Sequence, residues 1–305
     1  MKTPIQPVIK WAGGKRRLAP TIAECILDSG FKMKGNYYEP FLGGAALMLF
    51  LRPKRAIGID QNPELINFYT VVKDYPNELF ECLNKDFAPY HSEEFYYQVR
   101  AWDQRESFFE DFTPIQRAAR FVYLNKTCFN GIWRVNSRGQ NNVPWNHSNR
   151  APLPTREKIL TLSQYLSAHV AFVFGDYKEV LQLAQKGDLV YFDPPYDVEE
   201  NQSNFTEYTK GGFNRDDQTE LKRICDTLID RGVWVAISNS NTSFIRDLYK
   251  RDDAYSLYKV IDENKLRLAR TIGAKPSSRG YVNELLIIGK PMDGRKKRFL
   301  KKGEE

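Results

Sequence analysis

The residues of this chain best suited to chemistry stand together in the tetrapeptide Asp193-Pro194-Pro195-Tyr196. It follows the apolar run 189–192, which predicts a buried strand. In open α/β sheets, ligands bind beyond the carboxyl ends of the strands. The two prolines fix φ and lack an N–H, so the segment offers a ligand a carboxylate, rigidly held carbonyls and an aromatic ring. This combination fits an amino group on an aromatic ring. The alternative is a strand followed by a structural Pro-Pro turn.

Further glycine and aspartate residues lie at other predicted strand ends. Gly43 precedes a predicted helix, and glycine lets the backbone approach a ligand there, although a structural tight turn is an equal alternative. Asp60 ends the next strand, where an acid accepts the ribose hydroxyls of a nucleoside cofactor. Asp176 follows a third strand and is placed to accept an adenine amine. Its alternative role is to cap the next helix.

The segment between Ile115 and Leu160 indicates a nucleic-acid partner. It holds eight basic residues and one acid, in a chain whose formal net charge is +7. The basic residues are Arg117, Arg120, Lys126, Arg134, Arg138, Arg150, Arg156 and Lys158, and the aromatic residues among them are Phe121, Tyr123, Phe129, Trp133 and Trp145. Positive charges bind phosphates and aromatic rings stack on bases. The alternative is an ordinary solvated surface over an aromatic core.

Composition excludes several other classes of protein. The four cysteines show no CxxC or paired spacing, which indicates reduced thiols and no disulfide framework. The three histidines are isolated, so no metal site is expected. The sequence contains no apolar stretch of about 18 residues and no signal-peptide pattern. We therefore expect a cytoplasmic protein.

The order of predicted elements indicates an α/β fold. Strands are expected at 36–39, 55–60, 170–174, 189–192, 234–238, 254–260 and 281–288, and helices at 16–27, 45–51, 178–185, 216–231 and 242–250. This alternation predicts a mostly parallel sheet with helices on both faces. The stretch 63–166 lacks such alternation and reads as a mainly helical insertion. We expect a discontinuous catalytic domain (1–62 and 167–290), an inserted domain (63–166) and a basic tail (291–305).

Five motifs, in this order, resemble the Dam/DpnII-type (class alpha) DNA adenine-N(6) methyltransferase family. They are Lys10-Trp11-Ala12-Gly13-Gly14-Lys15, Glu39-Pro40-Phe41-Leu42-Gly43-Gly44, Gly58-Ile59-Asp60-Gln61-Asn62, Tyr123-Leu124-Asn125-Lys126-Thr127-Cys128-Phe129-Asn130-Gly131 and Asp193-Pro194-Pro195-Tyr196. The resemblance runs from about residue 8 to residue 288. One departure is Ala45, where many relatives have a third glycine; because alanine is small, we expect little effect.

The resemblance implies a Rossmann-like, S-adenosylmethionine-dependent methyltransferase sheet with an inserted target-recognition domain. The family's cofactor-binding positions match Trp11, Lys15, Phe41, Gly43, Asp60, Asp176 and Asp193. Its target-adenine pocket matches Asp193, Pro194 and Tyr196. Its DNA-contacting positions match Lys10, Phe129, Asn130, Ile132, Arg134, Asn136 and Pro144.

The resemblance therefore implies a site-specific enzyme that methylates the exocyclic N(6) amine of adenine in duplex DNA. The pattern around Arg134 resembles that of GATC-reading members, and the partner is double-stranded DNA with a flipped target adenine. A later tyrosine of the family's pattern is not evident; Ser148 lies near its place. A restriction endonuclease that acts on the same site without a stable complex is a further possible partner.

Three alternatives remain open at this point. The first two are methylation of an RNA adenine and methylation of a DNA cytosine at its N(4) amine. The third is a nucleic-acid-binding protein that has lost its activity. Methylation of cytosine at its 5-carbon needs a nucleophilic thiol, usually in Pro-Cys, and none of the four cysteines follows a proline.

Overall fold

The computed structural model describes residues 5–198, 212–250, 258–261, 268–269, 281–282 and 284–291. Nearly all of the expected basic tail and the first part of the expected strand 254–260 lie outside these residues. Among the helices in the described part of the chain, none has the length and apolar character that a membrane span requires.

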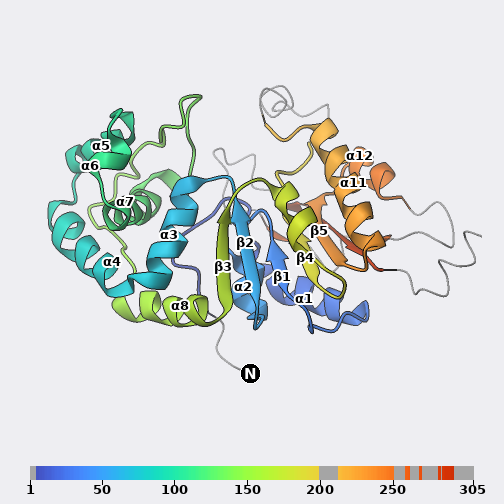
Figure 1. Cartoon of the computed structure of the whole chain (residues 1–305). Helices are drawn as coiled ribbons and strands as arrows, with labels where there is room; N and C mark the ends of the chain where they lie inside the picture. The colour runs from blue at the N-terminus through green and yellow to red at the C-terminus, as the bar shows by residue number, and fades with distance from the viewer. Residues whose placement is uncertain are drawn as a thin grey trace, which may run out of the picture. The chain divides into compact units, whose positions relative to one another are not determined.

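Seven strands form the central sheet, in the spatial order β3-β2-β1-β4-β5-β9-β6 (Figure 1). They are β1 (Tyr37–Glu39), β2 (Ala56–Asp60), β3 (Val170–Phe174), β4 (Leu189–Phe192), β5 (Trp234–Ser240), β6 (Tyr258–Ile261) and β9 (Glu284–Gly289). Strands β1, β4 and β5 are parallel, whereas β9 is antiparallel to β5 and β6. The expected strand 281–288 is divided, because β8 (Tyr281–Val282) pairs instead with β7 (Leu268–Ala269). The α/β, Rossmann-like class is confirmed.

The strand order contains a switch point between β1 and β4. The chain continues from β1 to β2 on one side, while β4 pairs with β1 on the other, with Tyr37 opposite Leu189. Ligands of open α/β sheets bind at such a point, outside the carboxyl ends of the strands. Every residue of β4 is buried, as its continuous apolar run predicts. The segments that follow β1 and β4 therefore begin at the ligand-binding edge of the sheet.

Eleven α-helices lie in the described part of the chain. They are α1 (Ala19–Asp28), α2 (Ala46–Leu51), α3 (Pro63–Asp74), α4 (Pro76–Cys82), α5 (Glu93–Arg100), α6 (Phe108–Asp111), α7 (Pro114–Thr127), α8 (Arg156–His169), α9 (Val180–Leu183), α11 (Arg215–Asp230) and α12 (Ser243–Leu248). Several begin with side-chain caps. Asn62 accepts from the N–H groups of Glu64 and Leu65, and Thr113 forms a capping box with Gln116.

The chain divides into two compact units. The first unit comprises Met1–Arg16, Leu42–Lys54 and Gly58–Gly175, and the second comprises Arg17–Phe41, Arg55–Ile57 and Asp176–Glu305. The first unit contains the whole stretch 63–166 together with other segments. The boundaries of the expected inserted domain remain a prediction.

Helices of the first unit pack around α3 and α7 (Figure 1). Arg117 on α7 forms an ion pair with Glu64 on α3, with Nη1 2.6 Å from Oε1. Not all of the stretch 63–166 is helical, however. Between α7 and α8, residues 128–155 form only a short 3₁₀ turn and isolated β-bridges. The expectation of a helical stretch was wrong for these residues. Asn130, Gly131 and Gly139 have positive φ angles, and the Asn136 side chain accepts from nearby backbone N–H groups, so turns form there.

Ala45, the departure from the family pattern, has a left-handed backbone. Its φ is +51° and its ψ is +32°, at the position just before α2. A residue with a Cβ pays about 1–2 kcal/mol for this conformation, which is partly offset by the greater freedom of glycine in the unfolded chain. We therefore predict that Ala45→Gly stabilises the protein by about 0.5–1 kcal/mol. Urea unfolding measures the change.

The control for Ala45→Gly is Ala23→Gly, in the interior of the right-handed helix α1. It should destabilise the protein by about 0.5–1 kcal/mol. Equal destabilisation by both substitutions would contradict the argument from backbone conformation.

Candidate active site and nucleic-acid surface

In the second unit, the Asp-Pro-Pro-Tyr segment leaves β4 at the ligand-binding edge of the sheet. Asp193 and Tyr196 are half-buried and Pro194 is buried. The Tyr196 hydroxyl donates to Glu284 Oε2 on β9 at 3.1 Å. Burial, and then the negative charges of Asp193 and Glu284, raise the pKa of the Tyr196 phenol. The tyrosine is therefore neutral, and its ring is fixed beside the Asp193 carboxylate.

An aromatic cluster lies at the same edge of the second unit. Phe41 stacks on Tyr177 with ring centroids 5.1 Å apart and an angle of 22°. Phe213 meets both rings edge-on, at 5.7 Å from each. Phe41 also contacts Phe192, the residue before Asp193, at 6.4 Å. The cluster places flat apolar faces where a heterocycle could stack.

Asp176 caps the short helix that follows β3. Its Oδ1 accepts from the N–H of Lys178 at 2.9 Å, which is the capping alternative that the sequence left open. A carboxylate has further acceptor capacity, so its contact with a ligand remains a prediction. Sequence reasoning missed Tyr177 and Phe213. The signal for Tyr177 was its place directly after an aspartate at a strand end; Phe213 had no local signal.

In the first unit, the Trp11 ring covers the glycine turn that precedes α2. A Cβ added at Gly43 would lie 2.7 Å from the indole Cδ1 and Nε1, and Gly43 has φ +44°. Both facts require glycine at this position. The Tyr69 hydroxyl donates to the Gly43 carbonyl at 2.9 Å. The structure thus brings together Trp11 and Gly43, two residues that the sequence assigned to cofactor binding.

Asp60 fixes the same turn from the end of β2. Its Oδ2 accepts from the Gly43 N–H at 3.1 Å and its Oδ1 accepts from the Asn62 N–H at 2.9 Å. Burial raises the pKa of Asp60, and the two backbone hydrogen bonds oppose that rise. Each carboxylate oxygen has a second lone pair. The side chain can therefore hold the turn and still accept a hydroxyl.

Lys10 and Lys15, the two lysines of the N-terminal motif, are held differently. The Lys15 side chain is 4% exposed, and its Nζ donates to the Gly13 carbonyl. Lys10 is exposed, but its backbone is tied to the buried Asn125 by two hydrogen bonds, of 2.8 and 2.7 Å. Asn125 also donates to the Gly131 carbonyl at 3.2 Å. Asn125 therefore joins the loop that carries Lys10 to the turn at 129–131.

That turn projects two of the expected DNA-contacting residues. Asn130 has φ +56°, and its side chain and that of Phe129 are exposed, Phe129 by 41%. The Phe129 N–H donates to the Pro144 carbonyl at 2.8 Å, and the Ile132 N–H donates to the Phe129 carbonyl at 3.3 Å. The structure therefore brings Lys10, Phe129, Asn130, Ile132 and Pro144 into one region.

Residues 134–142 form a short two-stranded ribbon, which we call the recognition ribbon. Its arms meet at a bridge between Val135 and Asn141. At the tip, the Asn136 side chain accepts from the N–H groups of Arg138 and Gln140, at 2.9 and 3.1 Å. At the arms, Arg134 donates from Nε to Asn142 Oδ1 at 2.7 Å and from Nη2 to the Asn142 carbonyl at 3.3 Å. A ribbon of this kind fits the major groove of DNA.

Part of the basic and aromatic segment is core rather than surface. Arg120 is fully buried and pairs with Asp103 at 2.7 Å, and Arg117 pairs with Glu64. Phe121 and Tyr123 are also fully buried. For these four residues the nucleic-acid interpretation was wrong, because α7 packs its face into the unit. The exposed basic residues are Arg134, Arg138, Arg150, Arg156 and Lys158.

Lys126 lies between the core and this basic surface. Burial, followed by the positive charges of Lys10 and Lys158, lowers the pKa of Lys126 to about 8. Lys10, Lys126 and Lys158, all in the first unit, therefore repel one another when they are protonated. An anion such as a phosphate group would relieve that repulsion.

Comparisons with known proteins show similarity along nearly the whole chain. Residues 11–267 match the family model for D12 class N6 adenine-specific DNA methyltransferases. The chain is 37% identical to the type II methyltransferase M1.LlaDCHI of Lactococcus lactis subsp. cremoris, over 94% of this chain and 96% of that protein. It is 35% identical to the type II methyltransferase M.MjaIII of Methanocaldococcus jannaschii, covering 93% and 99%. It is 31% identical to a DNA adenine methylase of Escherichia coli, covering 93% and 95%.

Proposed function

Because the chain belongs to the D12 class N6 adenine-specific DNA methyltransferase family, we propose that it transfers a methyl group from S-adenosylmethionine to the N(6) amine of adenine in duplex DNA, within GATC. The observation that carries the proposal is the position of Asp193, Pro194 and Tyr196 at the switch point of the sheet. Adenines in RNA and the N(4) amine of cytosine are the competing substrates.

The residues after β4 suit activation of an aromatic amine. The adenine amine is a poor nucleophile because its lone pair is delocalised into the ring. The Asp193 carboxylate and the Pro194 carbonyl accept its two hydrogens, which draws the nitrogen toward tetrahedral geometry and localises the lone pair. The nitrogen would then attack the methyl carbon in line with the C–S bond, which would break with its electron pair going to sulfur. The amine becomes more acidic as it is methylated, so it would lose a proton to water without a strong base. Asp193 acts by positioning and by electrostatic stabilisation rather than as a strong base.

The residues present fit S-adenosylmethionine. The cofactor, when bound, supplies an electrophilic methyl group on a sulfonium. In the first unit, Trp11, Lys15, Gly43 and Asp60 are the residues for its methionine and ribose parts; Trp11 covers a turn that admits no side chain at Gly43, and the Asp60 carboxylate retains lone pairs for a hydroxyl. In the second unit, Phe41 belongs with the residues for the methionine and ribose, and Asp176 is the residue for the adenine. The Tyr177 ring, which stacks on Phe41, offers the adenine a further flat face. Asp193 also matches a cofactor-binding position, but its main partner in this proposal is the target amine, and the other residues hold most of the cofactor.

The target base must leave the duplex to reach Asp193, at a cost of a few kcal/mol. Stacking on the Tyr196 ring offsets about 1–3 kcal/mol of this cost. Phe129, exposed beside Asn130, is the side chain that we propose fills the vacated place in the duplex. Lys10, Ile132, Asn136 and Pro144 contact the DNA around it. Since M1.LlaDCHI and M.MjaIII are named type II methyltransferases, we also propose that a restriction endonuclease reads the same site, without a stable complex.

The test of the proposed function uses duplex DNA and S-adenosylmethionine with a labelled methyl group. After digestion to nucleosides, the label is expected in N(6)-methyladenine. A parallel reaction with RNA of the same sequence is expected to remain unlabelled. Label that appears only in cytosine, or only in RNA, would overturn the proposal, and absence of label with retained DNA binding would favour an inactive binding protein.

Arg134 is predicted to read a guanine of the target site. Its hydrogen bonds to Asn142 use Nε and one N–H of Nη2, so the end of the guanidinium keeps its other N–H groups for a pair of hydrogen bonds. Such a pair to guanine contributes about 1–3 kcal/mol of discrimination. Arg134→Ala should therefore relax the preference at one position of GATC, measured as kcat/KM on GATC and its single-base variants.

The matched control is Arg138→Ala, at the tip of the same ribbon, where the side chain is exposed. We expect it to weaken all sites alike and to reduce the salt dependence of binding, as loss of a phosphate contact does. If Arg134→Ala also weakened all sites uniformly, base readout by Arg134 would be rejected. Preference of the wild type for another site would reject GATC.

A further inference from the structure

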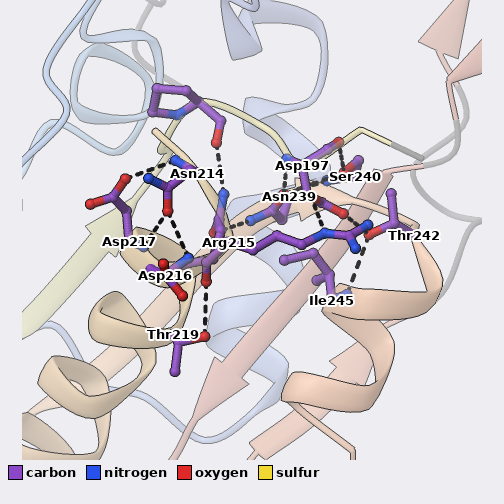
Figure 2. A network of polar contacts seen from close by, with 12 residues as sticks. Asp197, Asn214, Arg215, Asp216, Asp217, Thr219, Asn239, Ser240, Thr242 and Ile245 are labelled. Atoms are coloured by element: carbon purple, nitrogen blue, oxygen red, sulfur yellow. Dashed lines mark hydrogen bonds and ion pairs between the residues drawn. The ribbon is translucent and has the colours of Figure 1, made fainter. Parts of the chain in front are cut away.

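A buried polar network holds the chain directly after the Asp-Pro-Pro-Tyr segment. Gln218 on α11 and Asn239 on β5 are 1% and 0% exposed. Asn239 lies beside Asp197, Ser240 and Thr242 at the centre of the contacts drawn in Figure 2. All these residues belong to the second unit. Buried amides of this kind are costly unless every polar atom has a partner, so the network must be specific.

The donors and acceptors of the network form a single chain from the Pro195 carbonyl to the Asp197 N–H. A carbonyl only accepts, so the bond of 2.9 Å between Gln218 and the Pro195 carbonyl must come from the Gln218 Nε2. The Gln218 Oε1 then accepts from Asn239 Nδ2 at 3.0 Å. This leaves the Asn239 Oδ1 to accept from the Asp197 N–H at 3.2 Å. The orientation of each amide follows from the one before it.

Asp197 is fixed by its side chain as well. Its Oδ1 accepts from Arg215 Nε at 3.1 Å, and its Oδ2 accepts from the Thr242 hydroxyl at 2.6 Å. The Ser240 hydroxyl donates to the Asp197 carbonyl at 2.5 Å. The backbone is therefore held at the Pro195 carbonyl and at both the N–H and the carbonyl of Asp197.

These restraints set the geometry of the residues that face the target amine. Pro194 and Pro195 have φ fixed by their rings, so the remaining backbone freedom between Asp193 and Asp197 lies in the ψ angles and in φ of Tyr196 and Asp197. Holding the Pro195 carbonyl and the Asp197 backbone restricts that freedom. We propose that Gln218 and Asn239 are positioning residues that aim the Pro194 carbonyl and the Tyr196 ring at the target base. This inference rests on the proposed function.

The first test is Gln218→Met, which keeps the length of the side chain and removes both hydrogen bonds. A displacement of about 1 Å in a catalytic group costs up to about 100-fold in rate. We expect the single-turnover methylation rate to fall by about 10- to 100-fold, while the Kd for S-adenosylmethionine and the Kd for duplex DNA each stay within about threefold of wild type.

The second test separates positioning from a general loss of packing. In Gln218→Glu, the protonated carboxyl group can donate to the Pro195 carbonyl and accept from Asn239, as glutamine does. Burial raises the pKa of a carboxyl group, so the new group should keep its proton at low pH and lose it as the pH rises. The rate of this variant should be near that of wild type at low pH and should fall as pH rises, while the wild-type rate shows no such fall.

The control is Thr219→Val, the neighbouring residue on α11. Its hydroxyl donates to the Arg215 carbonyl at 2.8 Å and thus only within the helix, so the rate and its pH profile should match the wild type. Parallel pH profiles for Gln218→Glu and the wild type, or an unchanged rate in Gln218→Met, would overturn the inference. Failure of wild-type protein to methylate adenine would instead overturn the proposed function.

Discussion

Replacing Asp193 with alanine is expected to lower the rate of methyl transfer by about 100-fold or more while the affinity for S-adenosylmethionine changes by less than about threefold. The carboxylate is half-buried at the end of β4 and is assigned to the target amine. In the proposed mechanism this carboxylate both orients the amine and stabilises the positive charge that develops on it. Removing it should leave binding of the cofactor, which other residues hold, almost intact.

Asp60→Ala should show the opposite pattern. It removes the acceptor of the Gly43 and Asn62 N–H groups, and each lost hydrogen bond of a charged group costs about 1.5–3 kcal/mol. The Kd for the cofactor should therefore rise by about 10-fold or more. Calorimetry with S-adenosylmethionine and single-turnover methylation of duplex DNA measure the two effects separately.

Asp216→Ala is the control for these two acids, because Asp216 is an exposed residue of the first turn of α11. It should leave both quantities near wild type. A large loss of cofactor affinity in Asp193→Ala together with normal affinity in Asp60→Ala would show that the two acids are wrongly assigned.

Asp103→Ala should give the largest loss of stability, of about 3 kcal/mol or more. Asp103 pairs with Arg120, whose side chain is 1% exposed, at 2.7 Å. Burial lowers the pKa of Arg120, and the charge of Asp103 opposes that effect. Among the described residues, removing the carboxylate leaves the buried guanidinium with the carbonyls of Val99 and Arg100 as its hydrogen-bond acceptors. Urea unfolding at constant pH measures the loss.

The comparison variant is Glu81→Ala, which breaks the exposed ion pair with Lys85. It should not change the urea midpoint measurably, because exposed pairs contribute little. Asp103 also accepts from the Asn141 N–H at 2.8 Å, at the base of the recognition ribbon. Equal midpoints for Asp103→Ala and Glu81→Ala would contradict a structural role for the buried pair.

The strands that correspond to a continuous apolar run could be predicted from the sequence. Strands β3 and β4 begin and end at the predicted residues, because each is a continuous apolar run bounded by polar residues or glycine. The antiparallel placement of β9 between β5 and β6 was not predictable in this way. This placement depends on which edge strand of the sheet remains unpaired after the other strands have formed. The residues of β9 do not specify that edge.

The candidate site residues were identified from the sequence in the same way. Asp193, Asp60 and Gly43 were proposed because each stands in a short motif at a strand end, and their roles remain predictions. Gln218 and Asn239 were missed because they act on the motif from other elements, α11 and β5. Arg120 was misjudged as surface for the same reason. Its burial depends on Asp103, a partner on another segment of the chain that composition does not reveal.

The base of the recognition ribbon is hydrogen-bonded to other segments of the chain, whereas the tip is hydrogen-bonded only within itself in the described structure. Its base is held by Asp103, and by Tyr96 and Arg100, which both donate to the Val143 carbonyl. The hydrogen bonds around Asn136 close within the tip itself. Substitutions in the tip should therefore have little effect on the stability of the fold. If the ribbon reads DNA as proposed, substitutions at its exposed residues, Arg134 among them, would change the target sequence without touching Asp193, Pro194 or Tyr196.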